Sequence, residues 1–283
     1  YNDYVSKVIE SFPSEADQYS YVNAPFLTSR DDDGVVDKTL VDCILEDVFS
    51  DGPKLIVVEA AAGFGKTSTA YEIGKKICES NAVNIPLFAE LARDRKAKIF
   101  RHILLNEIDR RYPTLSSELV VEEIKNNRVI MILDGFDELL SESEDEERFE
   151  NSEAMLETIG ELLERDAKVI LTTRKTAILE GDDFYDWMYD HSDDFDVIRY
   201  SILEPQTSDW LDQSRIDDLE ASGLSADSIA NPVILSYLRY LSDVSFDEIK
   251  QDVDSIVDMY FKNMLEREQT RQGLRMSPDQ QAE

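Results

Sequence analysis

The sequence has few of the residues that build disulfides and transition-metal centres. Its 283 residues include two cysteines, Cys43 and Cys78, and two histidines, His102 and His191. Two cysteines exclude a disulfide framework and suit a reducing compartment, so we expect a cytoplasmic protein. So few nitrogen and sulfur ligands also exclude a cysteine–histidine metal site.

Basic residues and long apolar runs are scarce as well. Lys and Arg total 29 against 61 Asp and Glu, which gives a formal net charge of −32. Such a charge repels nucleic-acid backbones, so we expect no direct nucleic-acid binding by this segment, and any phosphate site has to be local. No apolar run reaches the roughly 18 residues of a membrane span. The chain starts at Tyr1 without a signal-like segment, and we expect a fragment of a longer protein.

Five short apolar runs are typical of buried strands, and segments with helical periodicity separate them. This alternation predicts an α/β fold over residues 51–205, with a parallel sheet between layers of helices. The predicted strands are "LIVVE" (55–59), "IPLFAEL" (85–91), "VIMILD" (129–134), "KVILTT" (168–173) and "VIRYSIL" (197–203).

The flanking regions lack strand signals. Residues 1–50 read as a linker with one helix at 36–49, and residues 206–283 as a small helical subdomain with helices at 207–221, 224–242 and 246–270. Within the core, the acidic run 141–150 is expected to be a loop leading into a helix at 152–165. Residues 181–196 mix aspartates with aromatics, which favours a surface loop with its aromatics turned inward over a partner-binding patch.

The stretch "EAAAGFGKTS" (59–68) matches the end of the phosphate-binding pattern G-x-x-x-x-G-K-[ST], with Ala60 where the first glycine is expected. Glycines allow successive N–H groups to converge on one anion. We expect Lys66 to reach the β- and γ-phosphates and Thr67 to bind Mg²⁺. The residues predicted to hold the nucleotide here are Ala62, Gly63, Phe64, Gly65, Lys66, Thr67 and Ser68.

Acidic side chains follow the strand in "VIMILDGFDELL" (129–140). Ligands of open α/β sheets lie beyond the carboxyl ends of the strands, so Asp134 is expected beside the phosphate loop as a Mg²⁺ ligand. Asp137 or Glu138 would orient or deprotonate the attacking water. Arg174, directly after the strand 168–173, would contact the γ-phosphate or pair with a nearby aspartate.

With these motifs in view, the chain resembles the NACHT family of signal-transduction ATPases, within the STAND group of P-loop NTPases. The likeness covers about residues 20–270. "AAGFGKTS" resembles the family's Walker A segment, and the D-G-x-D-E pattern of residues 134–138 resembles its Walker B segment. "NIPLFAELARDR" (84–95) and "VILTTR" (169–174) are similar to its second strand and its sensor strand. "ANPVILSYLRYL" (230–241) resembles a helix whose proline, here Pro232, packs near the adenine.

The resemblance implies a switch that uses ATP, ADP and Mg²⁺. A closed ADP form would be autoinhibited, and exchange for ATP would let the NTPase modules self-associate and activate an effector, with anti-phage defence as the expected role in a prokaryote. Sensor and effector domains would lie in the rest of the parent protein. We expect residues 1–283 to be the nucleotide-binding and first helical regions.

Two other functions fit the same motifs. A motor-type AAA+ ATPase would hydrolyse ATP steadily while remodelling protein or nucleic acid. A nucleotide-free scaffold would keep the phosphate loop as a relic, and Ala60 supports that alternative. The joint presence of Lys66, Thr67, Asp134 and Glu138 argues against a relic.

Overall fold

A computed structural model describes residues 21–29, 38–80, 83–91, 100–139, 152–174, 182–225, 229–251 and 256. The chain divides into two compact units, residues 1–203 and residues 204–283, which are considered separately below. The predicted acidic loop at 141–150 lies outside the described residues, as does the predicted helix beyond residue 256.

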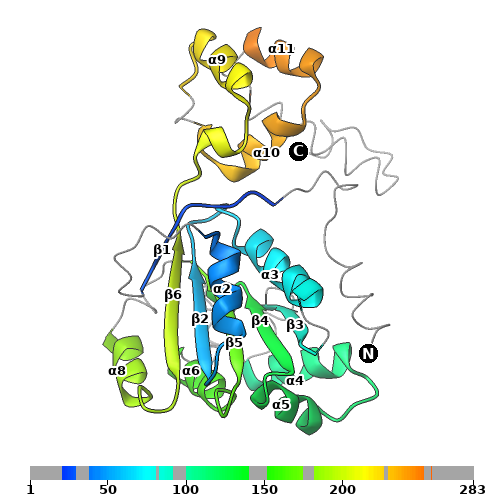
Figure 1. Ribbon diagram of the computed structural model, residues 1–283, viewed down its shortest axis with the longest axis vertical. Helices are drawn as coiled ribbons and strands as arrows, with labels where there is room; N and C mark the ends of the chain where they lie inside the picture. Colours follow the sequence, from blue (N-terminus) through cyan, green and yellow to red (C-terminus); the bar gives the residue numbers. More distant parts are fainter. Residues whose placement is uncertain are drawn as a thin grey trace, which may run out of the picture. The chain divides into compact units, whose positions relative to one another are not determined.

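The first unit is built on one six-stranded sheet with the order β1-β6-β2-β5-β4-β3 (Figure 1). β1 is antiparallel to β6, and the remaining neighbours are parallel. The five predicted strands are confirmed to within one residue at each end, and so is the α/β fold with a largely parallel sheet between helices. The strands are β1 (Phe26–Thr28), β2 (Lys54–Glu59), β3 (Ile85–Glu90), β4 (Val129–Asp134), β5 (Lys168–Thr173) and β6 (Asp196–Ile202).

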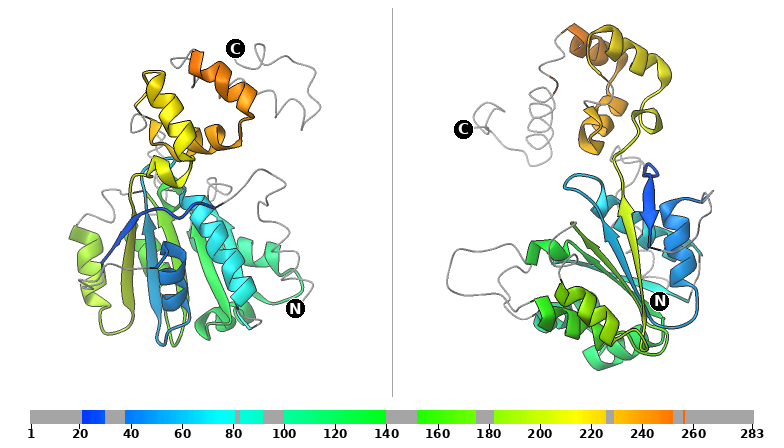
Figure 2. Two further views of the ribbon diagram at one scale, coloured as in Figure 1. Left: turned by 45° about the horizontal axis from the view of Figure 1, so that its top comes forward. Right: turned by 90° about the vertical axis from the view of Figure 1, so that its left-hand side faces the viewer.

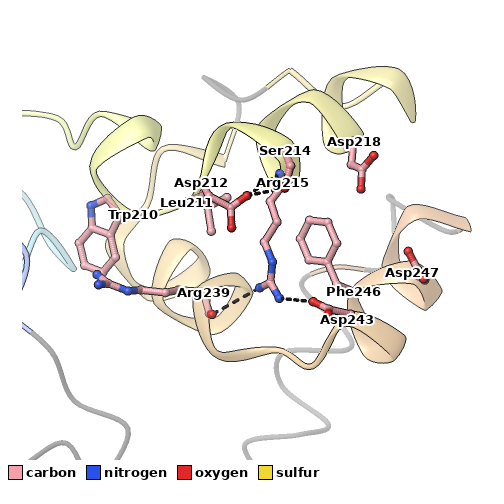
Figure 3. Close-up of a pocket in the computed structure, with 10 residues that line it drawn as sticks. All are labelled: Trp210, Leu211, Asp212, Ser214, Arg215, Asp218, Arg239, Asp243, Phe246 and Asp247. Atoms are coloured by element: carbon pink, nitrogen blue, oxygen red, sulfur yellow. Dashed lines mark hydrogen bonds and ion pairs between the residues drawn. The ribbon is translucent and has the colours of Figure 1, made fainter.

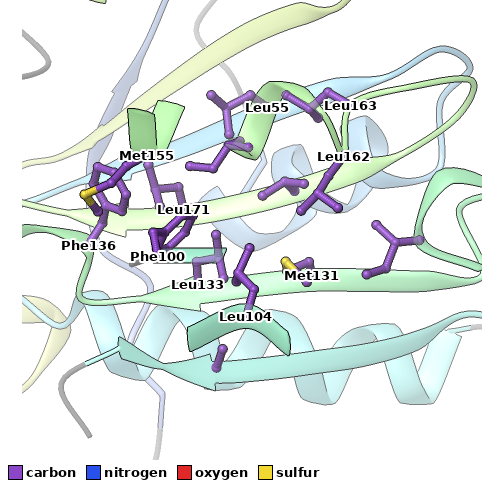
Figure 4. Close-up of a cluster of buried hydrophobic side chains, with 14 of the residues drawn as sticks. Leu55, Phe100, Leu104, Met131, Leu133, Phe136, Met155, Leu162, Leu163 and Leu171 are labelled. Carbon is purple, nitrogen blue, oxygen red and sulfur yellow. The ribbon is translucent and has the colours of Figure 1, made fainter. Parts of the chain in front are cut away.

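Helices cover both faces of this sheet (Figure 2). Side chains alternate along β2, so Ile56 and Val58 pack in the cluster with α2 and α3, while Leu55 and Val57 pack in the opposite cluster, drawn in Figure 4. Burial on both faces explains the continuous apolar runs of the sequence. The helices of this unit are α2 (Leu40–Val48), α3 (Lys66–Ser80), α4 (Phe100–Arg111), α5 (Ser117–Lys125), α6 (Ser152–Gly160) and α8 (Asp182–Asp190), with the 3₁₀ turn η3 (Phe136–Leu139).

The prediction of a loop at 181–196 was wrong, because α8 occupies most of that segment. Aspartates dominate its composition, yet Phe184 and Trp187 recur at helical spacing and are buried, as is Phe195 beyond the helix end. The expectation that the aromatics turn inward is thus confirmed for these three rings. Exposed Tyr185 and Tyr189 are the exceptions on the same helix.

Other boundaries also differ from the sequence prediction. The helix predicted at 152–165 ends at Gly160, and Arg165, five residues further on, has a left-handed φ of 57° that a helix reaching residue 165 could not contain. The linker helix is shorter than 36–49 because it is capped by Thr39, whose side chain accepts a hydrogen bond from the Asp42 N–H. β1 and α5 were missed altogether.

The second unit is a small helical cluster. Arg215 of α9 holds it together, because its guanidinium donates hydrogen bonds to the carbonyl oxygens of Leu238 and Leu241, pairs with Asp243 at 3.1 Å and lies 4.7 Å from the Phe246 ring. Arg215, Asp243 and Phe246 are among the residues that line a pocket of about 580 Å³ (Figure 3). The elements are η4 (Thr207–Asp209), α9 (Gln213–Ala221), α10 (Pro232–Tyr240) and α11 (Asp243–Gln251), shorter than the helices predicted at 207–221 and 224–242.

None of the helices within the described ranges combines the length and apolar character needed to cross a bilayer.

The packing of α8 gives a direct test of the fold. Phe184 is fully buried, so Phe184→Ala is expected to lower the free energy of unfolding of the first unit by about 3–5 kcal/mol. Tyr189→Ala, on the same helix but 80% exposed, is the matched control and should change it by less than about 0.5 kcal/mol. Urea denaturation measures both, and equal effects of the two substitutions would contradict the helix assignment.

Candidate functional site

The phosphate loop connects the end of β2 to the first residue of α3. Gly63 and Gly65 have φ values of 79° and 87°, a left-handed conformation that side chains rarely adopt. α3 begins at Lys66, so the N–H groups of its first turn have no acceptors within the helix. This loop and helix end therefore offer backbone donors and partial positive charge to an anion.

Ala60 occupies the strand exit rather than the bend of the loop. Within the described ranges, the non-glycine residues with positive φ are Asn127 and Arg165, so Ala60 has the ordinary negative φ. Its N–H donates to the Thr173 carbonyl oxygen at 3.2 Å, and its side chain is buried in the cluster with α2 and α3. An alanine therefore fits this backbone without strain, while the first glycine of the motif is missing.

Lys66 lies over the loop with its amine half-buried. Its Nζ contacts the Ala60 carbonyl oxygen at 3.4 Å, the upper limit for a hydrogen bond. Burial lowers the pKa of Lys66, the carboxylate of Asp137 opposes that shift, and Arg174 reinforces it. Within the described residues this long contact is the hydrogen bond that the amine makes, and Asp134, Asp137 and Glu138 lie near enough to act on it electrostatically.

Asp134 is the buried carboxylate at the end of β4. The Thr67 hydroxyl donates to its Oδ2 at 2.8 Å, and the Thr172 hydroxyl donates to its Oδ1 at 2.6 Å. Burial raises the pKa of Asp134, both hydroxyls oppose the rise, and nearby Glu90 adds to it. A phosphate-loop hydroxyl and a strand-end carboxylate therefore meet in one place, although β5 lies between β2 and β4.

The turn after β4 positions two further acidic residues. Gly135 has a φ of 81°, and its turn leads directly into η3, which carries Asp137 and Glu138. Asp137 accepts the backbone N–H of Arg174 at 3.0 Å on Oδ1 and pairs with the Arg174 Nε at 2.9 Å on Oδ2. The Glu138 carboxylate packs against Gly135, where an added Cβ would lie 3.4 Å from its Oε1.

Most of the sequence-predicted site residues lie within one neighbourhood. Asp134, Asp137, Glu138 and Arg174 all act electrostatically on the Lys66 amine. Ala62 and Phe64 lie in the loop, and Ser68 in the first turn of α3. Pro232, by contrast, is the first residue of α10 in the second unit, so its predicted contact with adenine stays a prediction.

Sequence reasoning missed three polar residues at this edge of the sheet. Thr172 contacts Asp134, Glu90 is paired in register with Asp134, and Glu59 at the end of β2 binds Arg199 at 2.5 Å. Their signal was present, because each is a polar residue at the last or second-last position of an apolar strand. Their partners depend on strand order, which the apolar runs do not encode.

The oxygen ligands of Thr67 and Asp134 suit Mg²⁺, a hard cation that binds few protein ligands and completes its shell with water and phosphate. In the described part of the chain no three His, Cys, Asp or Glu side chains gather in a group able to hold a metal ion. Thr67 and Asp134 could thus supply two oxygen donors to the shell of such a cation.

The chain is similar to a protein family and to solved structures. Residues 54–183 match the family model of the NACHT domain. One such structure is that of the ORC2 protein of Aeropyrum pernix in its ADP form. Its sequence is 14% identical to this chain, and the match covers 85% of this chain with a TM-score of 0.44. The chain spans 64% of the length of that structure. No curated protein matches the chain significantly.

The buried charge of Asp134 predicts a pH-dependent effect. Asp134→Asn removes the charge, so it is expected to stabilise the protein without nucleotide or metal at pH 7, by about 1.4 kcal/mol for each unit by which the pKa is raised. The gain should shrink as the pH falls through the raised pKa, because wild-type Asp134 then becomes protonated.

Thermal unfolding at a series of pH values between 4 and 7 measures this gain (approximately the range in which a raised carboxyl pKa acts). Asp186→Asn, at an exposed position of α8, is the control and should show no such trend. A destabilised Asp134→Asn at every pH would contradict the prediction.

Proposed function

Because residues 54–183 carry the NACHT domain of a P-loop nucleoside triphosphatase, we propose that the protein binds ATP with Mg²⁺ and hydrolyses it slowly, as a signalling switch. The observation that carries this proposal is the hydrogen bond between Thr67 and Asp134. Binding of a Mg²⁺–phosphate group requires a hydroxyl from the phosphate loop and a carboxylate from another strand at one point. A fold relic has no need to keep both.

The residues of this chain divide the work of holding the nucleotide. The N–H groups of the loop and of the first turn of α3 bind the phosphate oxygens, and Lys66 neutralises their charge. Thr67 would bind the cation through its oxygen lone pairs while it still donates its proton to Asp134. When bound, Mg²⁺ supplies charge neutralisation for the transferred phosphoryl group.

Hydrolysis requires a base for the attacking water, and the geometry favours Glu138 over Asp137. Both carboxylate oxygens of Asp137 are engaged by Arg174, one by its backbone N–H and one by its guanidinium. Both oxygens of Asp137 are therefore directed at Arg174 rather than at a water. Glu138 lies one residue further along the same 3₁₀ turn.

Arg174 is proposed to distinguish ATP from ADP. Its side chain is 54% exposed and bound to Asp137, so the ion pair contributes little stability and is easily exchanged. A γ-phosphate offers the guanidinium more negative charge than Asp137 does. The exchange of partners would favour one domain arrangement in the ATP form.

The wider role follows the family and rests on analogy. We propose that residues 51–205 are the NTPase core and residues 206–283 the helical subdomain, with Pro232 near the adenine. The ATP form would self-associate in the cytoplasm and activate an effector domain of the parent protein, with anti-phage defence as the proposed setting. The free thiols of Cys43 and Cys78 are compatible with a reducing compartment.

Removal of the Lys66 amine tests the phosphate site. Lys66→Ala should weaken binding of ATP by at least about 100-fold, because charge-assisted hydrogen bonds to two phosphates are lost. Anisotropy of a fluorescently labelled ATP measures the affinity. Lys76→Ala removes an amine from the same helix, where it pairs with Glu79, and is the matched control that should bind normally. Undiminished affinity in the Lys66 variant would refute the phosphate assignment.

Substitutions at two neighbouring acidic residues, Glu138 and Asp137, test hydrolysis and nucleotide discrimination separately. Glu138→Gln should leave ATP affinity intact and slow single-turnover hydrolysis by about 100-fold or more, since a general base is lost. Asp137→Asn should retain hydrolysis and instead change the ratio of ATP to ADP affinity, because Arg174 loses its partner. Unchanged turnover in Glu138→Gln would move the base to another group.

A further inference from the structure

Thr172 is a fully buried polar residue near the carboxyl end of β5, the strand that lies between β2 and β4. It lies on β5 opposite Val58 of β2, and the register of β4 with β5 pairs Leu133 with Leu171. The next residues along those two strands are Asp134 and Thr172. The strand between the phosphate loop and the metal-binding carboxylate thus presents a hydroxyl to that carboxylate.

The hydrogen bonds of Thr172 fix the direction of its proton. The Gly135 N–H donates to the Thr172 Oγ1 at 3.0 Å, and Oγ1 lies 2.6 Å from the Asp134 Oδ1. A hydroxyl has a single proton, so a hydroxyl that accepts from Gly135 donates its own proton to Asp134.

The two carboxylate oxygens of Asp134 have different hydrogen-bond partners. Oδ1 is bound to Thr172, and Oδ2 faces the Thr67 hydroxyl of the phosphate loop. We propose that Thr172 is a positioning residue for the metal site, whose hydroxyl fixes the Asp134 carboxylate so that Oδ2 and Thr67 meet the cation together. This inference rests on the proposed nucleotide function and deepens it.

The fold accounts for one bond of this hydroxyl, the one that it accepts from the Gly135 N–H, but not for the proton that it donates to Asp134. Valine has the same shape as threonine, and β-branched residues suit a buried strand equally well. Thr173, the next residue, is also fully buried, but its hydroxyl contacts the Arg174 carbonyl oxygen at 3.1 Å. The Thr172 hydroxyl instead donates a hydrogen bond to the Asp134 carboxylate.

Charge considerations agree with this geometry. Asp134 is buried, and the hydroxyls of Thr172 and Thr67 donate to its two carboxylate oxygens. A cation binds the ionised carboxylate, so a hydroxyl that donates to it supports metal binding as well as orientation. Substitution of a residue that hydrogen-bonds to a metal ligand typically lowers the affinity for the metal by about 10–100-fold.

The test is the dependence of ADP affinity on free Mg²⁺, measured by calorimetry on the full chain. Thr172→Val should raise the Mg²⁺ concentration at the midpoint by about 10-fold or more, because the carboxylate is no longer oriented. Thr172→Ser keeps the hydroxyl and should restore the wild-type midpoint. Thr173→Val, an identical change at an equally buried site, should leave the midpoint unchanged.

The possible outcomes separate this inference from the function on which it rests. A folded Thr172→Val protein with the wild-type midpoint would overturn the positioning role while leaving the nucleotide function intact. Wild-type protein that fails to bind ADP at any Mg²⁺ concentration would overturn both. Should Thr172→Val fail to fold, Thr172→Ala provides the same comparison, with circular dichroism as the check of folding.

Discussion

A buried carboxylate next to a phosphate-binding loop is the feature on which this structure depends. Asp134 is only 7% exposed, and within the described residues two neutral hydroxyls, those of Thr67 and Thr172, donate to its carboxylate. Burial of a carboxylate is costly unless a cation or strong donors compensate for it. Nearby Glu90 makes the charge less favourable still. Such an arrangement is understandable if a cation joins Asp134 when the protein works.

The order of the strands connects Asp134 with the phosphate loop and with Arg174 through β5. β5 lies between β2 and β4, so it touches both the strand that leads into the phosphate loop and the strand that ends in Asp134. Its last residues supply Thr172 to Asp134 and the Thr173 carbonyl to Ala60, and Arg174 follows at once. In the proposed function, a change in the partner of Arg174 therefore acts at the end of β5, the strand whose Thr172 hydroxyl contacts Asp134, the proposed metal ligand.

The strands and the motifs could be predicted from the sequence because they are local. Runs such as residues 129–134 are buried on both faces, so their apolar residues are continuous and their limits clear. The Gly63 and Gly65 positions follow from the backbone that an anion cradle requires. The meeting of Thr67 with Asp134 followed from the rule that ligands lie at the carboxyl ends of strands.

What escaped prediction depends on contacts between distant segments. The role of Thr172 requires knowledge that β5 and β4 are neighbours, and α8 was hidden because its aspartates masked the spacing of Phe184 and Trp187. Ala60 resembled a defect in the motif, yet its side chain packs in the core while its backbone pairs with β5. Sequence patterns classify residues by type, whereas these contacts depend on which way each side chain points and on which strands are neighbours.

The central claim is that the acidic edge of this sheet accepts a magnesium–nucleotide pair. Its most direct test is calorimetric titration of the unaltered chain with ADP and with ATP, each in excess Mg²⁺ and again in a chelator. The account predicts saturable heat with one nucleotide per chain and clearly weaker binding in the chelator. Absence of heat with both nucleotides, from protein that also carries no nucleotide after purification, would contradict it.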